Sequence, residues 1–102
     1  MSFAETQMSV IRWAEDRKII PNSTPEAQLL KTVEELGELV GAVLKKRPAQ
    51  IEDGFGDVLV TLTIAAALLD VDLTDCFEGS YQEIRHRKGT MSAEGLFIKE
   101  EK

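Results

Sequence analysis

Hydrophobic and polar positions recur with a helical period in four stretches of the chain, which predicts four helices joined by short connections. A capping box, formed by Ser2 and Glu5, marks the start of the first helix. Pro25 stands in the first turn of the second helix, where a proline costs no hydrogen bond, and Pro48 follows the end of that helix. The four helices are expected at roughly residues 2–18, 24–46, 50–69 and 74–88.

The third stretch is apolar on nearly every side after Asp57, and such a helix belongs at the centre of a helical assembly. The second stretch carries one apolar stripe, spaced alternately by four and three residues: Leu29, Val33, Leu36, Val40 and Val43. Residues 90–102 have no helical period, so we expect an irregular C-terminal tail in which Phe97 and Ile98 contact the body. The pattern predicts an all-α fold, a four-helix bundle forming a single domain over residues 1–102.

Composition narrows the class of protein. With 102 residues, of which 43% are apolar and 29% charged, the chain has the make-up of one compact globular domain. Its formal net charge of −6 argues against nucleic acid or an anionic membrane as a partner, because both attract basic proteins. The uncharged run at residues 58–69 is shorter than the ~20 residues that a membrane span requires.

Compartment and assembly follow from two further features. The single cysteine, Cys76, excludes an internal disulfide, and the first residues lack the basic start and apolar run of an export signal. Both features favour the cytoplasm. A helix that is apolar all round also needs more cover than three short neighbours provide in a chain of this length. We therefore expect homo-oligomerisation to complete the bundle, as a homodimer or, alternatively, a homotetramer.

Carboxylates gather on the second and third predicted helices. Glu35 and Glu38 are three residues apart, and Glu34 lies one turn before Glu38. Asp53 and Asp57 are four residues apart at the start of the third helix. Because the connection between the two helices is short, they should form an antiparallel hairpin that brings Glu35 and Glu38 level with Asp57. Carboxylates that converge beside an apolar helix repel one another, and Mg²⁺, completed by substrate phosphates, would relieve that repulsion.

Structural explanations of the same acids remain open. Acidic residues on a helix are commonly a solvated face, and this applies to the ridge on the second helix. Asp57 could instead form a structural ion pair with Lys31, with Lys45 or with the basic turn at residues 85–88.

The order of the motifs resembles the MazG-like all-α nucleoside triphosphate pyrophosphohydrolases, a superfamily that also includes dimeric dUTPases and dCTPases. The resemblance covers residues 28–99: Glu-Glu-x-x-Glu, a loop, Gly-Asp entering an apolar helix, and a helix ending in EIRHRKG. It implies a MazG-like bundle and a Mg²⁺-dependent enzyme, with Mn²⁺ as an accepted substitute. The implied reaction converts a nucleoside triphosphate to the monophosphate and pyrophosphate, in nucleotide-pool control or house-cleaning.

The resemblance also assigns the carboxylates. Glu35 and Glu38 match the family's first pair, either of them being the catalytic base, and Asp57 matches the aspartate of its second motif. The family commonly has a glutamate where this chain has Gly54; Asp53 is the expected substitute, because a short MazG-like branch reads Asp-x-x-Gly-Asp. The implied metal ligands are Glu34, Glu35, Glu38, Asp53 and Asp57.

Several polar and aromatic side chains are candidates for substrate contact: Gln28, Lys31, Tyr81, Arg85, Lys88 and Trp13. Lys31 lies one turn before Glu35 on the same helical face. The cations near residue 88 could meet the phosphates, or could simply be favourably placed at a helix C-terminus. Tyr81 and Trp13 could stack on the base, or could belong to the core or an interface.

Two other functions are alternatives to an enzyme. A nucleotide- or metal-binding regulator would keep the pocket without turnover, and Gly54 is the feature that favours it. A purely structural helical bundle would carry its acids on a solvated face. A divalent cation added with nucleotide should stabilise the regulator against heat but leave the structural bundle unchanged.

Overall fold

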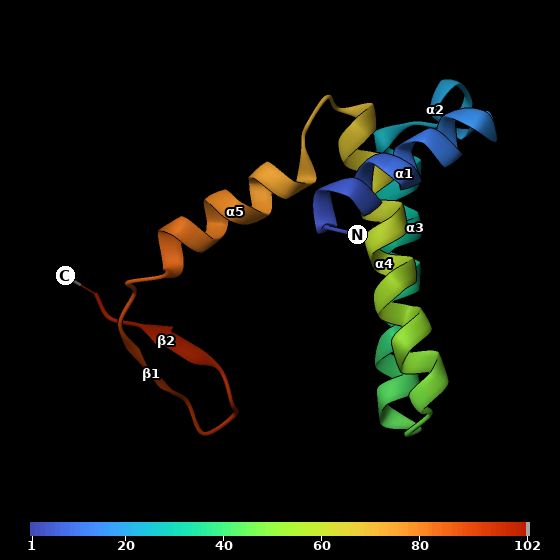
Figure 1. Ribbon diagram of the computed structural model, residues 1–102. Coiled ribbons are helices and arrows are strands. Elements are labelled where there is room, and N and C mark those ends of the chain that lie inside the picture. Colours follow the sequence, from blue (N-terminus) through green and yellow to red (C-terminus); the bar gives the residue numbers. More distant parts are fainter. Residues whose placement is uncertain (102) are drawn as a thin grey trace.

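A computed structural model describes residues 1–101 and shows a mainly helical chain (Figure 1). The all-α fold class predicted from the sequence is confirmed. Four long helices correspond to the four predicted ones, and a single helical turn lies between the first two. In chain order the helices are α1 (Phe3–Asp16), α2 (Ile19–Asn22), α3 (Pro25–Leu44), α4 (Pro48–Leu68) and α5 (Leu73–Ile84). The strands are β1 (Gly89–Met91) and β2 (Phe97–Lys99).

The helices begin where their capping residues predict. Ser2 Oγ accepts a hydrogen bond from the Glu5 N–H at 3.1 Å, and Glu5 Oε1 accepts one from the Ser2 N–H at 3.0 Å. This reciprocal pair is the predicted capping box. Thr24 Oγ1 accepts from the Ala27 N–H at 3.1 Å and caps α3, whose first residue is Pro25. Local sequence therefore fixes the start of both helices.

Helices α3 and α4 form an antiparallel hairpin in simple register. Thr32 Oγ1 lies 2.8 Å from Thr61 Oγ1, and Gly54 packs against Leu39. The step from Thr32 to Leu39 along α3 thus matches an equal step backwards from Thr61 to Gly54 along α4. At Gly54 a Cβ atom would lie only 2.9 Å from Leu39 Cδ1 and 3.3 Å from Leu39 Cα. The absence of a side chain at Gly54 therefore permits the close approach of the two helices.

Helix α4 is the central element, as its apolar sequence predicts, and contacts α3, α1 and α5. Helix α5 and the two strands project from the body as an arm (Figure 1). The arm is attached where α5 begins: Gln7 Oε1 accepts from the backbone N–H of Thr74 at 3.1 Å and also from its hydroxyl group. The rings of Phe3 and Phe77, 6.0 Å apart, add an apolar contact at the same junction.

The prediction of an irregular C-terminal tail over residues 90–102 is wrong where the tail contributes strands, at residues 90–91 and 97–99. Strands β1 and β2 pair in antiparallel fashion, with Thr90 opposite Ile98. Gly95, at a φ of 87°, lies in the turn between them. Phe97 and Ile98 do not hold the tail against the helical body, because more than half of each side chain is exposed: 52% and 55%. A pair of three-residue strands is too short to produce a recognisable sequence period.

The apolar stripe of α3 does not face α4. Its five members expose between 42% and 66% of their surface: Leu29, Val33, Leu36, Val40 and Val43. The face that meets α4 instead carries Thr32, Glu35, Leu39 and Ala42. The radius of gyration, 16.3 Å, exceeds the value of about 13 Å expected for a compact domain of this length. One chain therefore leaves much of its apolar surface uncovered.

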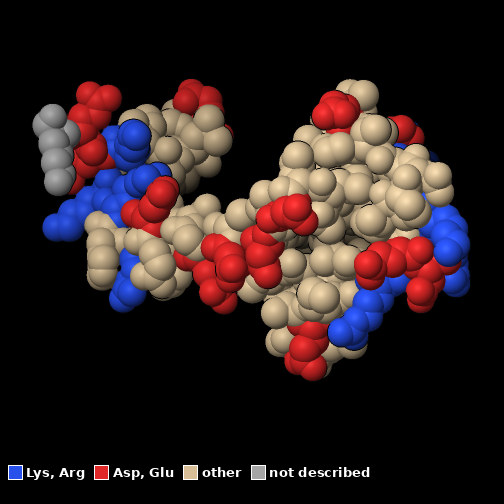
Figure 2. All heavy atoms as spheres, turned by 90° about the horizontal axis from the view of Figure 1, so that it is seen from above, with Lys and Arg blue, Asp and Glu red and all other residues tan. Residues whose placement is uncertain are grey.

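Figure 2 shows the surface from above: uncharged residues make up the centre of the helical body, charged residues of both signs lie along its edge, and a second group of Lys and Arg lies on the arm. Within residues 1–101 no helix is by itself long and apolar enough to cross a membrane, although α4 and α5, bent by 103° between them, meet the length and composition criteria together.

Candidate active site

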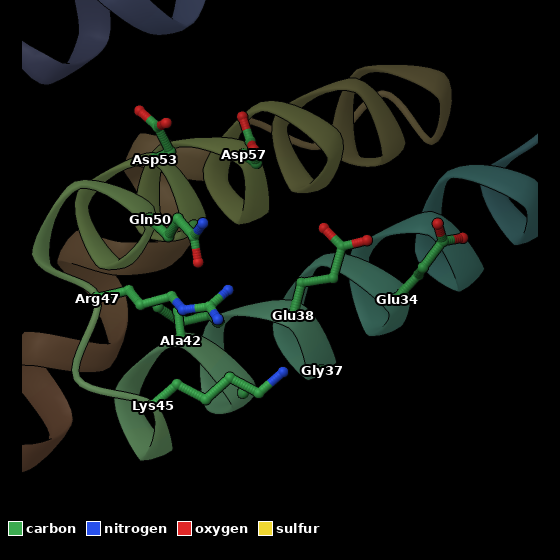
Figure 3. A pocket seen from close by; sticks show the side chains of 12 residues that line it. Glu34, Gly37, Glu38, Ala42, Lys45, Arg47, Gln50, Asp53 and Asp57 are labelled. Carbon is green, nitrogen blue, oxygen red and sulfur yellow. The ribbon is translucent and has the colours of Figure 1, made fainter.

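An acidic cleft of about 700 Å³ runs along the α3–α4 hairpin (Figure 3). Glu34 and Glu38 reach it from α3, and Asp53 and Asp57 from α4. Four of the five predicted metal ligands therefore line one cleft. At the closed end of the hairpin, where α3 connects to α4, its lining changes to Lys45, Arg47 and Gln50.

A second hollow of about 340 Å³ adjoins the acidic cleft at Asp57, which lines both. It contains three of the predicted substrate contacts, from α1 and α3: Trp13, Gln28 and Lys31. The fifth predicted ligand, Glu35, lines this hollow beside apolar side chains. Those apolar side chains are Ile19, Val60 and Ile64. The acidic groups therefore lie between the partly apolar hollow and the basic residues at the end of the hairpin where α3 connects to α4.

Two carboxylates of α3, Glu34 and Glu35, form ion pairs with Lys31. Glu35 is the more buried of the two, with 13% of its side chain accessible. Burial, reinforced by the negative charges of Glu38 and then Asp57, raises the pKa of Glu35 above its ordinary value of 4.5. Lys31 opposes this shift, since its Nζ lies 3.6 Å from Glu35 Oε1. Among the causes of the raised pKa, only the charge of Asp57 acts across the hairpin, from α4.

The donor set fits a hard divalent cation. All five groups are carboxylates, the ligands that Mg²⁺ and Mn²⁺ prefer, and a cation would relieve the repulsion from Glu38 and Asp57 that adds to burial in raising the pKa of Glu35. In residues 1–101, as the side chains lie, no three acidic, histidine or cysteine groups converge closely enough to hold an ion. Carboxylates that repel one another are expected to stay apart without a cation.

The structure explains, as the sequence did not, why residue 54 is a glycine and not the family's glutamate. It is buried in the contact with Leu39, so a side chain there would be directed against α3. Asp53, by contrast, lies in the acidic cleft with Asp57. The missing glutamate of the family motif thus coincides with close helix packing, and the neighbouring aspartate supplies a carboxylate to the cleft.

The alternative that Asp57 forms a structural ion pair is not supported. Within residues 1–101 the ion pairs are those of Lys31 Nζ with Glu34 Oε1, at 3.8 Å, and with Glu35 Oε1. Asp57 takes part in neither. Its carboxylate lies in the acidic cleft, and none of the basic groups in residues 1–101 comes within 4.0 Å of it.

The predicted substrate contacts on the arm are not brought to either hollow within one chain. Arg85 Nη1 donates to Gln82 Oε1 at 3.0 Å, and Lys88 lines a separate depression together with Lys99 of β2. Tyr81 is 56% exposed and does not belong to the core. The arm carries these three residues away from the α3–α4 hairpin (Figure 1).

Sequence reasoning missed three residues that line the cleft: Lys45, Arg47 and Gln50. Lys45 and Arg47 lie at the connection between the helices, and Gln50 lies in the first turn of α4. The available signal was the run of three cations between the two acidic motifs, Lys45, Lys46 and Arg47, of which Lys45 was considered only as an ion-pair partner of Asp57. Trp13, which the sequence did suggest, is 45% exposed in its hollow, with the Arg17 guanidinium 5.9 Å from the ring centre.

Comparison with known proteins agrees with this arrangement. The MazG nucleotide pyrophosphohydrolase domain family matches residues 23–92, which include both acidic motifs. The chain belongs to this family, and the predicted resemblance is confirmed. The family's enzyme class, hydrolases that act on nucleotide phosphoanhydride bonds, is the class predicted from the sequence.

Two individual proteins are similar to the chain. The cyanophage S-2L MazG-like pyrophosphohydrolase, whose structure holds dGDP and three catalytic Mn²⁺ ions per active site, is 25% identical. Its TM-score is 0.71, with 99% of each chain covered. The uncharacterized 18.2 kDa protein in the rep-hol intergenic region of Haemophilus phage HP1 (strain HP1c1) is 41% identical over 64 residues. These residues are 63% of this chain but only 39% of the phage HP1 protein.

Proposed function

We propose that the protein is a Mg²⁺-dependent pyrophosphohydrolase that converts a ribo- or deoxyribonucleoside triphosphate to the monophosphate and pyrophosphate. The observation that carries the proposal is the meeting of both acidic motifs at Asp57, in a chain of the MazG family. The structural neighbour with bound dGDP and Mn²⁺ supports a nucleotide as substrate and a divalent cation as cofactor. We expect the reaction to serve control of the cytoplasmic nucleotide pool.

Five carboxylates would hold the cation: Glu34, Glu35, Glu38, Asp53 and Asp57. Mg²⁺ is the expected ion, with Mn²⁺ as a substitute, and when bound it neutralises phosphate oxygens and raises the reactivity of the phosphoryl group. The repulsion among the carboxylates favours the binding of a cation over an empty cleft.

The side chains have defined tasks in this reaction. Glu35 or Glu38 orients a water molecule and accepts its proton. The oxygen of the water forms a new bond to the α-phosphorus, the α–β phosphoanhydride bond breaks, and its electron pair leaves with the departing pyrophosphate. The hollow beside Trp13 takes the nucleoside, with the indole ring against the base and Gln28 and Lys31 in polar contact.

We also propose that the enzyme works as a homodimer, with a homotetramer as the alternative. The accessible surface of 7935 Å² is larger than the roughly 5,700 Å² expected for a compact monomer of this mass. The excess exceeds what a standard protein–protein interface buries in total. A second copy over the exposed stripe of α3 would remove it, and Tyr81, Arg85 and Lys88 on the arm would then serve the partner's site.

A direct test incubates the purified protein with a panel of nucleoside and deoxynucleoside triphosphates and Mg²⁺, and follows pyrophosphate and monophosphate. Glu38→Gln should abolish turnover. Glu52→Gln is the matched control, because Glu52 is an exposed carboxylate of α4 that lines neither hollow. If a folded protein binds nucleotide with Mg²⁺ but hydrolyses none of the panel, the enzyme proposal is wrong and the protein is a nucleotide-binding regulator.

A further inference from the structure

Two cations, Lys45 and Arg47, line the closed end of the acidic cleft. Figure 3 shows both side chains extended along the cleft in the direction of Glu38. Lys45 directly follows α3, and a side chain at the C-terminal end of a helix leans back toward the N-terminus of that helix. The extension of the lysine toward the carboxylates is therefore a consequence of its position.

Neither cation is neutralised by a neighbouring acid. Within the described residues 1–101, the only ion pairs with N···O distances up to 4.0 Å are those of Lys31. Two positive charges two residues apart, both exposed to the same cleft, repel each other at short range. A multiply charged anion in the cleft would attract both of them without displacing an existing ion pair.

The beginning of α4 adds positive potential at the same end. Arg47 is the residue before α4, and in the described chain no side chain caps the helix there. The first N–H groups of a helix have no partners within it and carry the positive end of the helix dipole. Gln50, in this first turn, also lines the cleft. Cations combined with a helix N-terminus are the arrangement that phosphate groups prefer.

The cleft has room for phosphates between the carboxylates and the cations. Gly37 and Gly41 line its α3 wall, and a Cβ atom at either position would meet nothing within 4 Å. The volume of about 700 Å³ lies in the usual range for small-molecule sites. Along α3 the order is therefore an apolar hollow beside Trp13, the carboxylates, an open glycine wall and the cations.

We infer that Lys45 and Arg47 form the binding subsite for the two terminal phosphates of the substrate, which leave as pyrophosphate. This inference rests on the proposed function and adds an orientation to it: the nucleoside lies at the Trp13 end, and the terminal phosphates lie at the α3–α4 connection. The carboxylates then flank the bond that breaks. Lys45 contributes a point charge, and Arg47 a planar group that can make two parallel hydrogen bonds to one phosphate.

The test compares Lys45→Gln, Arg47→Gln and Lys46→Gln with the wild type. Lys46 is the matched control, because it lies between the two cations and loses the same charge but does not line the cleft. Two quantities are measured in Mg²⁺ buffer: the KM and kcat for a hydrolysed triphosphate, and the calorimetric Kd of inorganic pyrophosphate. Circular dichroism confirms that each variant is folded, as expected for exposed positions.

Loss of a charged hydrogen-bond donor should weaken binding about tenfold or more. Lys45→Gln and Arg47→Gln should therefore raise both the KM and the pyrophosphate Kd by that factor, and Lys46→Gln should change them little. Equal behaviour of all three variants overturns the inference, while hydrolysis by the wild type leaves the proposed function intact. If the wild type hydrolyses nothing but its binding of pyrophosphate depends on Lys45 and Arg47, the subsite stands and the proposed function fails. A wild type that does not bind pyrophosphate overturns the inference.

Discussion

Replacing Gly54 by alanine tests the close contact that positions the two acidic motifs. In a helix interior the replacement of glycine by alanine stabilises by about 1 kcal/mol, because alanine restricts the unfolded chain. At Gly54, however, the new Cβ would lie 2.9 Å from Leu39 Cδ1 and 3.1 Å from Leu39 Cβ. Overpacking of this kind costs about 1–3 kcal/mol. The net effect should range from no change to a loss of about 2 kcal/mol.

Gly56→Ala is the matched control, since it lies in the same helix and its Cβ would meet nothing within 4 Å. It should show the full gain of about 1 kcal/mol. The two variants should therefore differ by about 1–3 kcal/mol in free energy of unfolding. Urea denaturation of both proteins at one concentration measures this difference. Equal stabilisation of the two variants would refute the close contact and, with it, the explanation for the missing family glutamate.

Three further perturbations probe other parts of the chain. Burial and neighbouring carboxylates raise the pKa of Glu35 above 4.5, so the folded state binds its proton more tightly and loses stability as the pH rises through that pKa. Glu35→Gln should thus stabilise the metal-free protein at neutral pH but not below pH 4.5. Urea denaturation at the two pH values measures the free energy of unfolding, and an equal gain in stability at both pH values would contradict this reasoning. Gly89→Ala would place a Cβ against the Ile98 carbonyl oxygen, so β1 amides should exchange hydrogen faster, whereas Gly79→Ala, whose Cβ meets nothing within 4 Å, should not change them. A nucleoside triphosphate should alter the emission of Trp13, the single tryptophan, and inorganic pyrophosphate should not; matching responses would exclude the nucleoside from that hollow.

Local signals predicted much of the fold. The helical period located α1, α3, α4 and α5, and capping residues fixed the starts of α1 and α3. The short connection predicted an antiparallel hairpin in simple register, and Thr32 opposite Thr61 confirms it. This register is what brings the two acidic motifs to the same level. Predictions that depended only on neighbours in sequence, or on one short loop, were therefore the successful ones.

Predictions that depended on distant packing were less complete. A period shows which face of α3 is apolar, but it does not show whether the same chain covers that face, and the stripe around Val33 and Val40 is exposed. The direction of the arm, which carries Arg85 and Lys88 away from the hollows, depends on contacts at Gln7 that no pattern encodes. Lys45 and Arg47 were not predicted to line the cleft, because residue spacing does not show in which direction a side chain at a helix end or in a short connection extends.

Both acidic motifs lie on one helical hairpin, and this has a consequence for the order of folding. The contact that sets the register joins Thr32 and Thr61, only 29 residues apart in sequence. Contacts between residues so close in the chain cost little loop-closure entropy and form early, so helical hairpins are among the fastest structures to assemble. The carboxylates should therefore be in place before the arm docks at Thr74. A folding intermediate that contains only α3 and α4 would already carry all five of the proposed metal ligands.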